Sequence, residues 1–404
     1  MIIENVQLAH SNEATALSAR CKIRKIGWDT VYFSVSNAIQ RGYACNDASP
    51  FAAALLLPAM KQGEDLVIRG SISNQLYKGM QAIMDEVRHW DIGLNPIRIE
   101  ADALVADGHE PDRSASFFSG GVDSFYTYLK HQEDLAEADR IDSFILVNGF
   151  DIDLHNNQLW ERTLENISAI ARADEVDLVV VKTNIKALID PLLSWDYTHG
   201  GCLAAAGLFL RAAFHQIYIP ASYPLADQIP WGSSLALDGN WSTERTRFVH
   251  DGTEATRTEK VIRQIARSRL ALEHLRVCYL NVKGTYNCGK CDKCLRTMMN
   301  LYLAGALEKA RTFPHHIDPG LVAGLPAAAE ENSRIFRREI LHALERENLA
   351  PDLQRALTAS LDKTVAMKRS ILTTAENRAK YLDHAYTRGF AYSVWAGLFG
   401  RKFS

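Results

Sequence analysis

Alternating hydrophobic and polar positions dominate the first third of the chain. Residues 16–26 and 30–35 place an apolar side chain at nearly every second position, which predicts strands with one buried face. Residues 51–61 are almost entirely apolar, and residues 76–90 carry apolar side chains at helical spacing, so we expect two helices there. This mixture predicts an N-terminal α+β module over residues 1–112.

Short apolar runs then alternate with helical segments. The runs at residues 116–118, 141–148, 177–183 and 216–220 have the length and composition of buried strands. Because each is followed by a helical or loop segment, the alternation predicts an α/β domain at residues 113–303, with a parallel sheet and helices on both faces.

Helical patterns return after residue 303. Residues 331–345, 351–363 and 365–384 mix charges of both signs with apolar positions, which predicts a C-terminal helical region over residues 304–404. The aromatic segment at residues 390–399 is expected to dock on the domain, and the alternative is a role at a partner or membrane surface.

Composition narrows the classes of partner. The 404 residues include 45 basic and 48 acidic side chains, a net charge of −3, so the chain as a whole has no electrostatic attraction to nucleic acid or to an anionic membrane. No apolar run approaches the roughly 20 residues that span a bilayer, and the N-terminus lacks a signal-peptide pattern. We therefore expect a soluble, cytoplasmic protein that does not bind membrane; the net charge disfavours nucleic acid as a partner but leaves a local basic groove open.

One short motif between an expected strand and an expected helix suggests a phosphate-binding site. Residues 119–124 read Ser-Gly-Gly-Val-Asp-Ser; the glycines allow the backbone to turn around an anion, and the amides of the following helix face it. The serine hydroxyls would donate to phosphates, and Asp123 would bind the Mg²⁺ that accompanies ATP. The alternative is a glycine turn that only joins strand to helix. The predicted ATP site comprises Ser119, Gly120, Gly121, Val122, Asp123 and Ser124, with Ser119, Asp123 and Ser124 as the catalytic candidates.

Four of the seven cysteines are concentrated in one segment. Cys278, Cys288, Cys291 and Cys294 have the spacing Cys-x9-Cys-x2-Cys-x2-Cys. Four thiolates complete the tetrahedral shell of a structural zinc ion and leave no position open for water, so zinc here would stabilise the fold. An iron–sulfur cluster is the alternative, because sulfur ligands alone do not distinguish the two.

Together, the loop and the cysteines resemble the 7-cyano-7-deazaguanine synthase family of PP-loop ATP pyrophosphatases, which have an adenine nucleotide alpha hydrolase-like fold. The resemblance covers about residues 114–303 and includes Cys278-Tyr279, the Cys-Gly-x-Cys-Asp-x-Cys run at residues 288–294, and Arg257-Thr258-Glu259. The family's Asp-Tyr-Gly-Gln-Arg-His motif is replaced by residues 148–155. The additional terminal regions resemble those of the enlarged, divergent members carried by bacterial antiphage defence systems.

This resemblance implies an enzyme that uses ATP and Mg²⁺ to adenylate a 7-carboxy-7-deazaguanine-like carboxylate, with release of pyrophosphate. Arg257 and Lys260 are expected to neutralise a phosphate or carboxylate. Transfer of the acyl group to ammonia would give an amide and, after a second adenylation, a nitrile. Transfer to the amine of a partner protein would stop at the amide, and the N- and C-terminal regions are the expected binding surfaces for that partner.

Two other functions are compatible with the same motifs. The chain could be a catalytically silent, ATP-binding partner or scaffold subunit, or a tRNA-modifying PP-loop enzyme, which would be expected to carry a catalytic cysteine pair or a basic RNA-binding surface.

For two further segments the sequence allows two interpretations each. Residues 195–201, before an expected buried helix at residues 203–214, form either a second binding loop or a plain connection, and Trp231 either stacks on a purine-like ring or packs in the fold.

Overall fold

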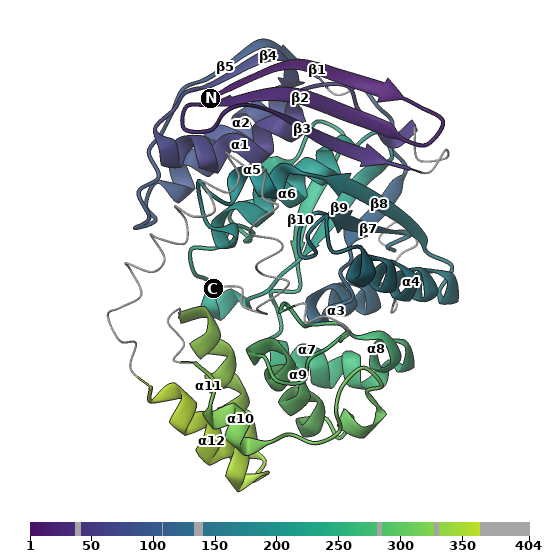
Figure 1. Cartoon of the computed structure of the whole chain (residues 1–404), viewed down its shortest axis with the longest axis vertical. Helices are drawn as coiled ribbons and strands as arrows, with labels where there is room; N and C mark the ends of the chain where they lie inside the picture. The colour runs from purple at the N-terminus through teal and green to yellow at the C-terminus, as the bar shows by residue number, and fades with distance from the viewer. Residues whose placement is uncertain (37–41, 107, 133–139, 281–284, 327–330, 364–404) are drawn as a thin grey trace.

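A single ten-stranded sheet runs through the protein, with the order β10-β9-β6-β7-β8-β3-β2-β1-β4-β5 (Figure 1). The computed structural model describes residues 1–36, 42–106, 108–132, 140–280, 285–326 and 331–363. The strands are β1 (Ile2–His10), β2 (Thr15–Ile23), β3 (Gly27–Val35), β4 (Leu66–Ser73), β5 (Ile99–Val105), β6 (Arg113–Phe117), β7 (Ser143–Asn148), β8 (Asp177–Thr183), β9 (Phe214–Pro220) and β10 (Arg247–Asp251).

The half of the sheet from β10 to β8 is entirely parallel. Its strands β6 to β9 lie where the sequence predicts the four buried strands, so the α/β class is confirmed. β10 was not among the predicted strands, because residues 247–251 read Arg-Phe-Val-His-Asp and carry too little apolar character. Pairing alongside β9 forms this strand.

Helices cover both faces of this parallel half. Successive strand residues point to opposite faces: Phe117 joins the core under α1, α2, α5 and α6, whereas Phe118 and Phe144 join the core under α3, α4 and α7–α12. The helices are α1 (Ser49–Gln62), α2 (Asn74–Val87), α3 (Val122–Lys130), α4 (Asn157–Ala173), α5 (Ile185–Ile189), α6 (Trp195–Phe209), α7 (Arg257–Arg263), α8 (Arg269–His274), α9 (Asp292–Leu303), α10 (Pro319–Ala323), α11 (Glu331–Arg346) and α12 (Pro351–Leu361).

The N-terminal strands continue this sheet. β3 pairs antiparallel with β8 through residues 33–35, and β2, β1, β4 and β5 extend the sheet beyond it. Phe33 of β3 shows the shared core: its ring centroid lies 5.6 Å from that of Phe51 in α1 and 6.2 Å from that of Phe209 in α6. The division predicted at residue 112 stays a prediction, but the sheet and the hydrophobic core are continuous across it.

Helix α6 differs from its predicted form. It begins at Trp195, so residues 195–201 are its first turns, and the expectation of a loop there was wrong. The glycines of this segment serve close packing: a Cβ on Gly200 would lie 1.8 Å from the carbonyl oxygen of Gly232, and one on Gly201 would lie 2.8 Å from that of Ala53. The backbone therefore approaches its neighbours more closely than a side chain would allow.

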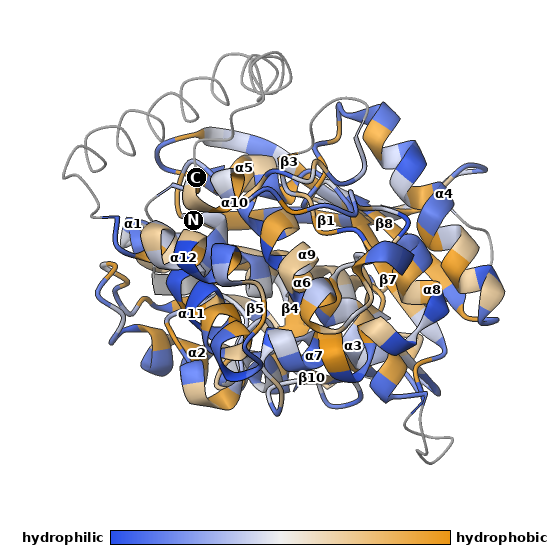
Figure 2. Ribbon diagram, turned by 90° about the horizontal axis from the view of Figure 1, so that it is seen from below, coloured by the Kyte–Doolittle hydropathy of each residue, from blue (hydrophilic) through white to orange (hydrophobic). Residues whose placement is uncertain are grey.

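The C-terminal region is helical as predicted where it is described. α11 and α12 match the helices expected at residues 331–345 and 351–363, and they lie beside α9 and α10 at the lower end of Figure 1. The ribbons of surface helices such as α4 carry both hydrophilic and hydrophobic residues (Figure 2). The segments at residues 365–384 and 390–399 lie outside the described residues. In the described part of the chain, no helix has the length and apolar character of a membrane span.

Substitution of Phe33 tests whether the N-terminal strands and the α/β region share one core. We expect Phe33→Ala to lower the free energy of unfolding by about 3–5 kcal/mol, because it leaves a cavity between β3, α1 and α6. Trp28→Ala is the matched control on the same strand; its side chain is 41% exposed, and its loss should cost about 1 kcal/mol or less. Denaturant unfolding followed by circular dichroism measures both. Two separated transitions in the wild-type protein would contradict a shared core.

Candidate active site and metal centre

The order of the parallel strands reverses direction at one point in the sheet. From β6 the chain proceeds to β7 and β8 on one side, and then returns to β9 and β10 on the other side. In open α/β sheets, ligands bind beyond the carboxyl ends of the strands at such a reversal. Here it lies between β6 and β9, so the 119–124 loop after β6 and residues 221–223 after β9 border it.

The 119–124 loop turns sharply from β6 into α3. Gly120 has φ +73°, a conformation that favours glycine, and Gly121 is the N-cap residue of α3. No side chain caps this helix, so the amides of its first turn are available to an anion. Ser119 is exposed beside them. The buried Ser124 hydroxyl instead donates to the Gly121 carbonyl oxygen at 3.1 Å, so it stabilises the loop itself.

Three of the predicted site residues meet at the start of α3. Asp123 Oδ2 accepts a hydrogen bond from Arg257 Nη2, and Asp123 Oδ1 lies 3.5 Å from Lys260 Nζ. Arg257 and Lys260 are three residues apart on α7 and therefore share one face of the helix. Thr256 and Glu259 cap this helix reciprocally, with Thr256 N donating to Glu259 Oε2 at 2.9 Å, so Glu259 has a structural role.

Lys260 links this group to the loop after β9. Its Nζ donates to the Ala221 carbonyl oxygen at 2.6 Å, and its side chain is 1% exposed. Burial lowers the pKa of Lys260, because desolvation disfavours the charged form, and the negative charge of Asp123 opposes that effect. Asp123 thus faces two cations at the boundary between β6 and β9.

The C-terminal helix α11 contributes a residue that the sequence did not indicate. The Phe336 ring centroid lies 4.3 Å from Arg257 Cζ and 4.5 Å from Arg296 Cζ of α9. The same ring stacks on Tyr223, with the centroids 5.1 Å apart. Because residues 331–345 read as a charged surface helix, no local pattern distinguishes Phe336 from an ordinary core position.

Aromatic rings form a continuous series along this edge, which we call the aromatic strip. The ring centroids of Trp195 and His199 lie 6.2 Å apart, those of His199 and Trp231 5.0 Å, and those of Trp231 and Tyr223 5.5 Å. Burial lowers the pKa of His199, which favours its neutral imidazole. Trp231 therefore packs against protein rings, and its predicted stacking on a purine-like ring stays a prediction.

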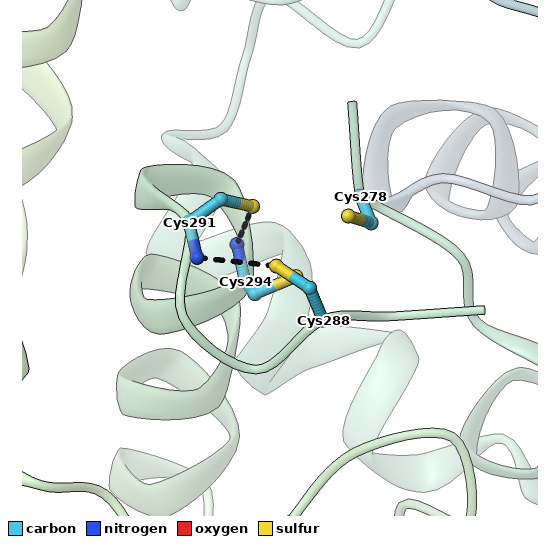
Figure 3. Close-up of side chains that lie close together, drawn as sticks. All are labelled: Cys278, Cys288, Cys291 and Cys294. Carbon is cyan, nitrogen blue, oxygen red and sulfur yellow. Dashed lines mark hydrogen bonds between the residues drawn. The ribbon is translucent and has the colours of Figure 1, made fainter. Parts of the chain in front are cut away.

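The four predicted metal ligands come together (Figure 3). The Sγ atoms of Cys278, Cys288, Cys291 and Cys294 all lie within 4.8 Å of one another and point toward one space. Backbone amides support them: Cys291 N donates to Cys288 Sγ at 3.3 Å, and Cys294 N donates to Cys291 Sγ at 3.4 Å. Such amides stabilise thiolates. This cysteine cluster could hold a zinc ion with four sulfur ligands.

Local sequence explains the shape of the cluster. Gly289 has φ +69°, and a Cβ there would lie 2.7 Å from Pro314 Cγ, so glycine is required at this turn. Cys291 then serves as the N-cap of α9. The segment before Cys278 reaches the predicted ATP site, because Arg276 N donates to the Gly120 carbonyl oxygen at 2.8 Å. The metal centre is therefore adjacent to the 119–124 loop.

Comparisons of this chain with protein-family models, curated proteins and solved structures give no match.

Metal binding can be measured directly. We expect the wild-type protein to carry about one zinc ion per chain and Cys291→Ser to lose it, because that variant removes one of four sulfur ligands while serine can still cap α9. The melting temperature should fall with the metal. Cys202→Ala is the matched control, since Cys202 is buried in α6 outside the cluster. Elemental analysis and thermal unfolding test this, and bound iron instead of zinc would favour an iron–sulfur cluster.

An acid-sensitive ion pair anchors α3 to the end of β10. Asp251 is desolvated, which raises its pKa, but His131 and Lys130 outweigh this and lower the pKa to about 2. The contribution to stability, of order 2 kcal/mol, is therefore present above the ordinary pKa of 3.8 and lost as the pH falls toward 2. We expect Asp251→Asn to be destabilised at about pH 6 and to lose much less stability than the wild type on acidification to about pH 2.5. Equal acid losses in denaturant titrations would contradict this.

Proposed function

We propose that this protein is an ATP-dependent, AMP-forming ligase. It adenylates a 7-carboxy-7-deazaguanine-like carboxylate and transfers the acyl group to an amine. The observation that carries the proposal is the meeting of Asp123, Arg257 and Lys260 beside an uncapped helix N-terminus, at the strand reversal of a parallel sheet. This combination of amides and cations suits a polyphosphate.

The local charge supports a polyanionic ligand. The chain carries a net charge of −3, yet the side chains gathered around Phe336 and the start of α3 include three cations, Arg257, Lys260 and Arg296. Asp123 and Asp292, which pair with Lys260 and Arg296, supply two opposing charges. The excess positive charge matches the phosphates of ATP better than a neutral ligand. Among the described residues, Asp123 Oδ1 has no hydrogen-bond donor, although Lys260 Nζ lies 3.5 Å away, so it keeps a lone pair that a Mg²⁺ ion would use.

The proposed reaction assigns a role to each of these groups. A substrate carboxylate oxygen attacks the α-phosphorus of ATP, the bond to the β-phosphate oxygen breaks, and pyrophosphate leaves toward the 119–124 loop. The amides of α3 stabilise the charge on that leaving group, and Arg257 and Lys260 neutralise it. Mg²⁺, when bound at Asp123, would add Lewis-acid stabilisation of the same phosphates. An amine then attacks the acyl carbon, a proton is lost from nitrogen, and AMP departs.

Zinc would have a separate and structural role. With four sulfur ligands the cysteine cluster leaves no open coordination position, so it supplies no reactive water. Through the hydrogen bond from Arg276 N to the Gly120 carbonyl oxygen, it would hold the 119–124 loop in shape.

The acceptor amine is either ammonia or an amine of a partner protein, and we favour the protein in an antiphage defence context. The C-terminal region supports this choice. α11 contributes Phe336 to the site, and Glu339 of the same helix accepts a hydrogen bond from the Thr258 amide of α7. A partner that contacted this helix would therefore lie close to the activated carboxylate.

The decisive experiment incubates the protein with 7-carboxy-7-deazaguanine, Mg-ATP and either ammonia or candidate partner proteins. AMP, pyrophosphate and intact masses are followed together. We expect AMP formation in the wild type and about a 100-fold loss in Asp123→Asn, because the variant loses the charge that orients Arg257 and Lys260. Asp85→Asn is the matched control; this side chain is 75% exposed on α2.

The possible results distinguish the acceptor amine and the alternative functions. Mass transfer to a partner protein supports conjugation, and a nitrile product identifies ammonia as the acceptor. ATP binding without AMP formation under every combination would favour a silent scaffold subunit. Equal turnover by Asp123→Asn and wild type would place the active site elsewhere.

A further inference from the structure

Arg296 is a further buried cation near the proposed site. It lies on the first turns of α9, only two residues after the last cysteine of the cluster, and its side chain is 6% exposed. Its guanidinium lies over the Phe336 ring, as does that of Arg257. The cysteine cluster, α11 and the predicted ATP site therefore converge on this one side chain.

The hydrogen bonds of Arg296 are incomplete. Its Nε lies 2.8 Å from Asp292 Oδ2, but Asp292 also pairs with Arg337 at 2.9 Å, so one carboxylate serves two guanidiniums. Arg296 Nη1 is buried and has no hydrogen-bond partner within the described ranges. Leaving a buried donor unpaired is unfavourable, and more so for a charged group. Such a donor at a proposed active site points to a bound acceptor.

Lys293, one turn before Arg296 on α9, supplies a second positive charge. Its side chain is exposed, and no ion pair of Lys293 occurs in the described part of the chain. Its Nζ lies 5.8 Å from the ring centroid of Tyr279, the residue after Cys278. Lys293 and Arg296 are three residues apart on α9 and therefore share one face of that helix.

We propose that Arg296 and Lys293 form a carboxylate-binding subsite that holds the substrate's reacting group, with the planar heterocycle placed along the aromatic strip. This inference rests on the function proposed above and names the residues that orient its substrate. Arg296 Nη1 donates to one carboxylate oxygen, and Lys293 neutralises the charge from the solvent side. The other oxygen is then directed toward Arg257 and the α-phosphate.

The arrangement favours a carboxylate over a phosphate of ATP. The 119–124 loop already offers helix amides, with Arg257 and Lys260 beside Asp123, on the β6 side of the site. Arg296 and Lys293 instead lie on α9, where Arg296 contacts the same Phe336 ring as Arg257. Two anions that must react with one another need separate cations, and these two groups provide them.

The subsite can be tested by binding alone. Isothermal titration calorimetry compares 7-carboxy-7-deazaguanine with its neutral analogue, 7-amido-7-deazaguanine, on the full-length, metal-loaded protein. We expect the wild type to prefer the carboxylate by at least about tenfold and Arg296→Gln to lose that preference, because the charge-assisted hydrogen bond is absent. Mg-ATP affinity should stay within about threefold of the wild type.

One control variant and one replacement variant accompany Arg296→Gln. Arg269→Gln on α8 removes an arginine that is 86% exposed, and it should leave both affinities unchanged. If Arg296→Gln fails to fold, Lys293→Gln replaces it, since its exposed side chain can be altered without disturbing the core, and it should weaken carboxylate binding several-fold.

The outcomes also separate this inference from the proposed function. A carboxylate preference that persists in both Arg296→Gln and Lys293→Gln would overturn the subsite, as would a wild type without any preference, even if AMP is formed. A loss of ATP affinity with the preference intact would assign the two cations to phosphate instead. Carboxylate preference without AMP formation would refute the ligase and leave the subsite standing.

Discussion

The pairing of Asp123 with Arg257 and Lys260 is the interaction on which the arrangement of the site depends. It joins the helix after β6 to the helix after β10 across the reversal of the parallel sheet. Lys260 extends the connection to the loop after β9 through the Ala221 carbonyl oxygen. Because Lys260 is buried and Asp123 and Arg257 are only partly exposed, removing one of them would leave a poorly solvated charge without its partner.

A second set of contacts attaches the C-terminal helices to that group. Phe336 lies against two guanidiniums, and Asp292 binds Arg296 and Arg337 from different helices. The cysteine cluster begins α9 and, through Arg276, contacts the loop after β6. The cysteine cluster, the C-terminal region and the predicted ATP site thus form one connected unit, in which Phe336 of α11 contacts Arg257.

The sequence predicted the elements better than their assembly. Period-two alternation located β2 and β3, apolar runs located β6 to β9, and the helical spacing of residues 76–90 located α2, because these patterns follow directly from backbone geometry. Residues 195–201 were misjudged as a loop since two glycines usually break helices, and here they permit close packing against Gly232 and Ala53. The need for glycine at these positions depends on backbone segments that are distant in the sequence.

The same distinction between local pattern and tertiary assembly applies to the candidate site. The sequence by itself determined the 119–124 loop and the cysteine spacing, because glycine dihedrals and tetrahedral ligation act over a few residues. It did not determine that Phe336 and Arg296 join Arg257, since no local pattern links positions so far apart along the chain. It also did not determine that the N-terminal strands extend the parallel sheet. Tertiary structure decided both, because strand pairing and the burial of charge depend on which surfaces meet in space.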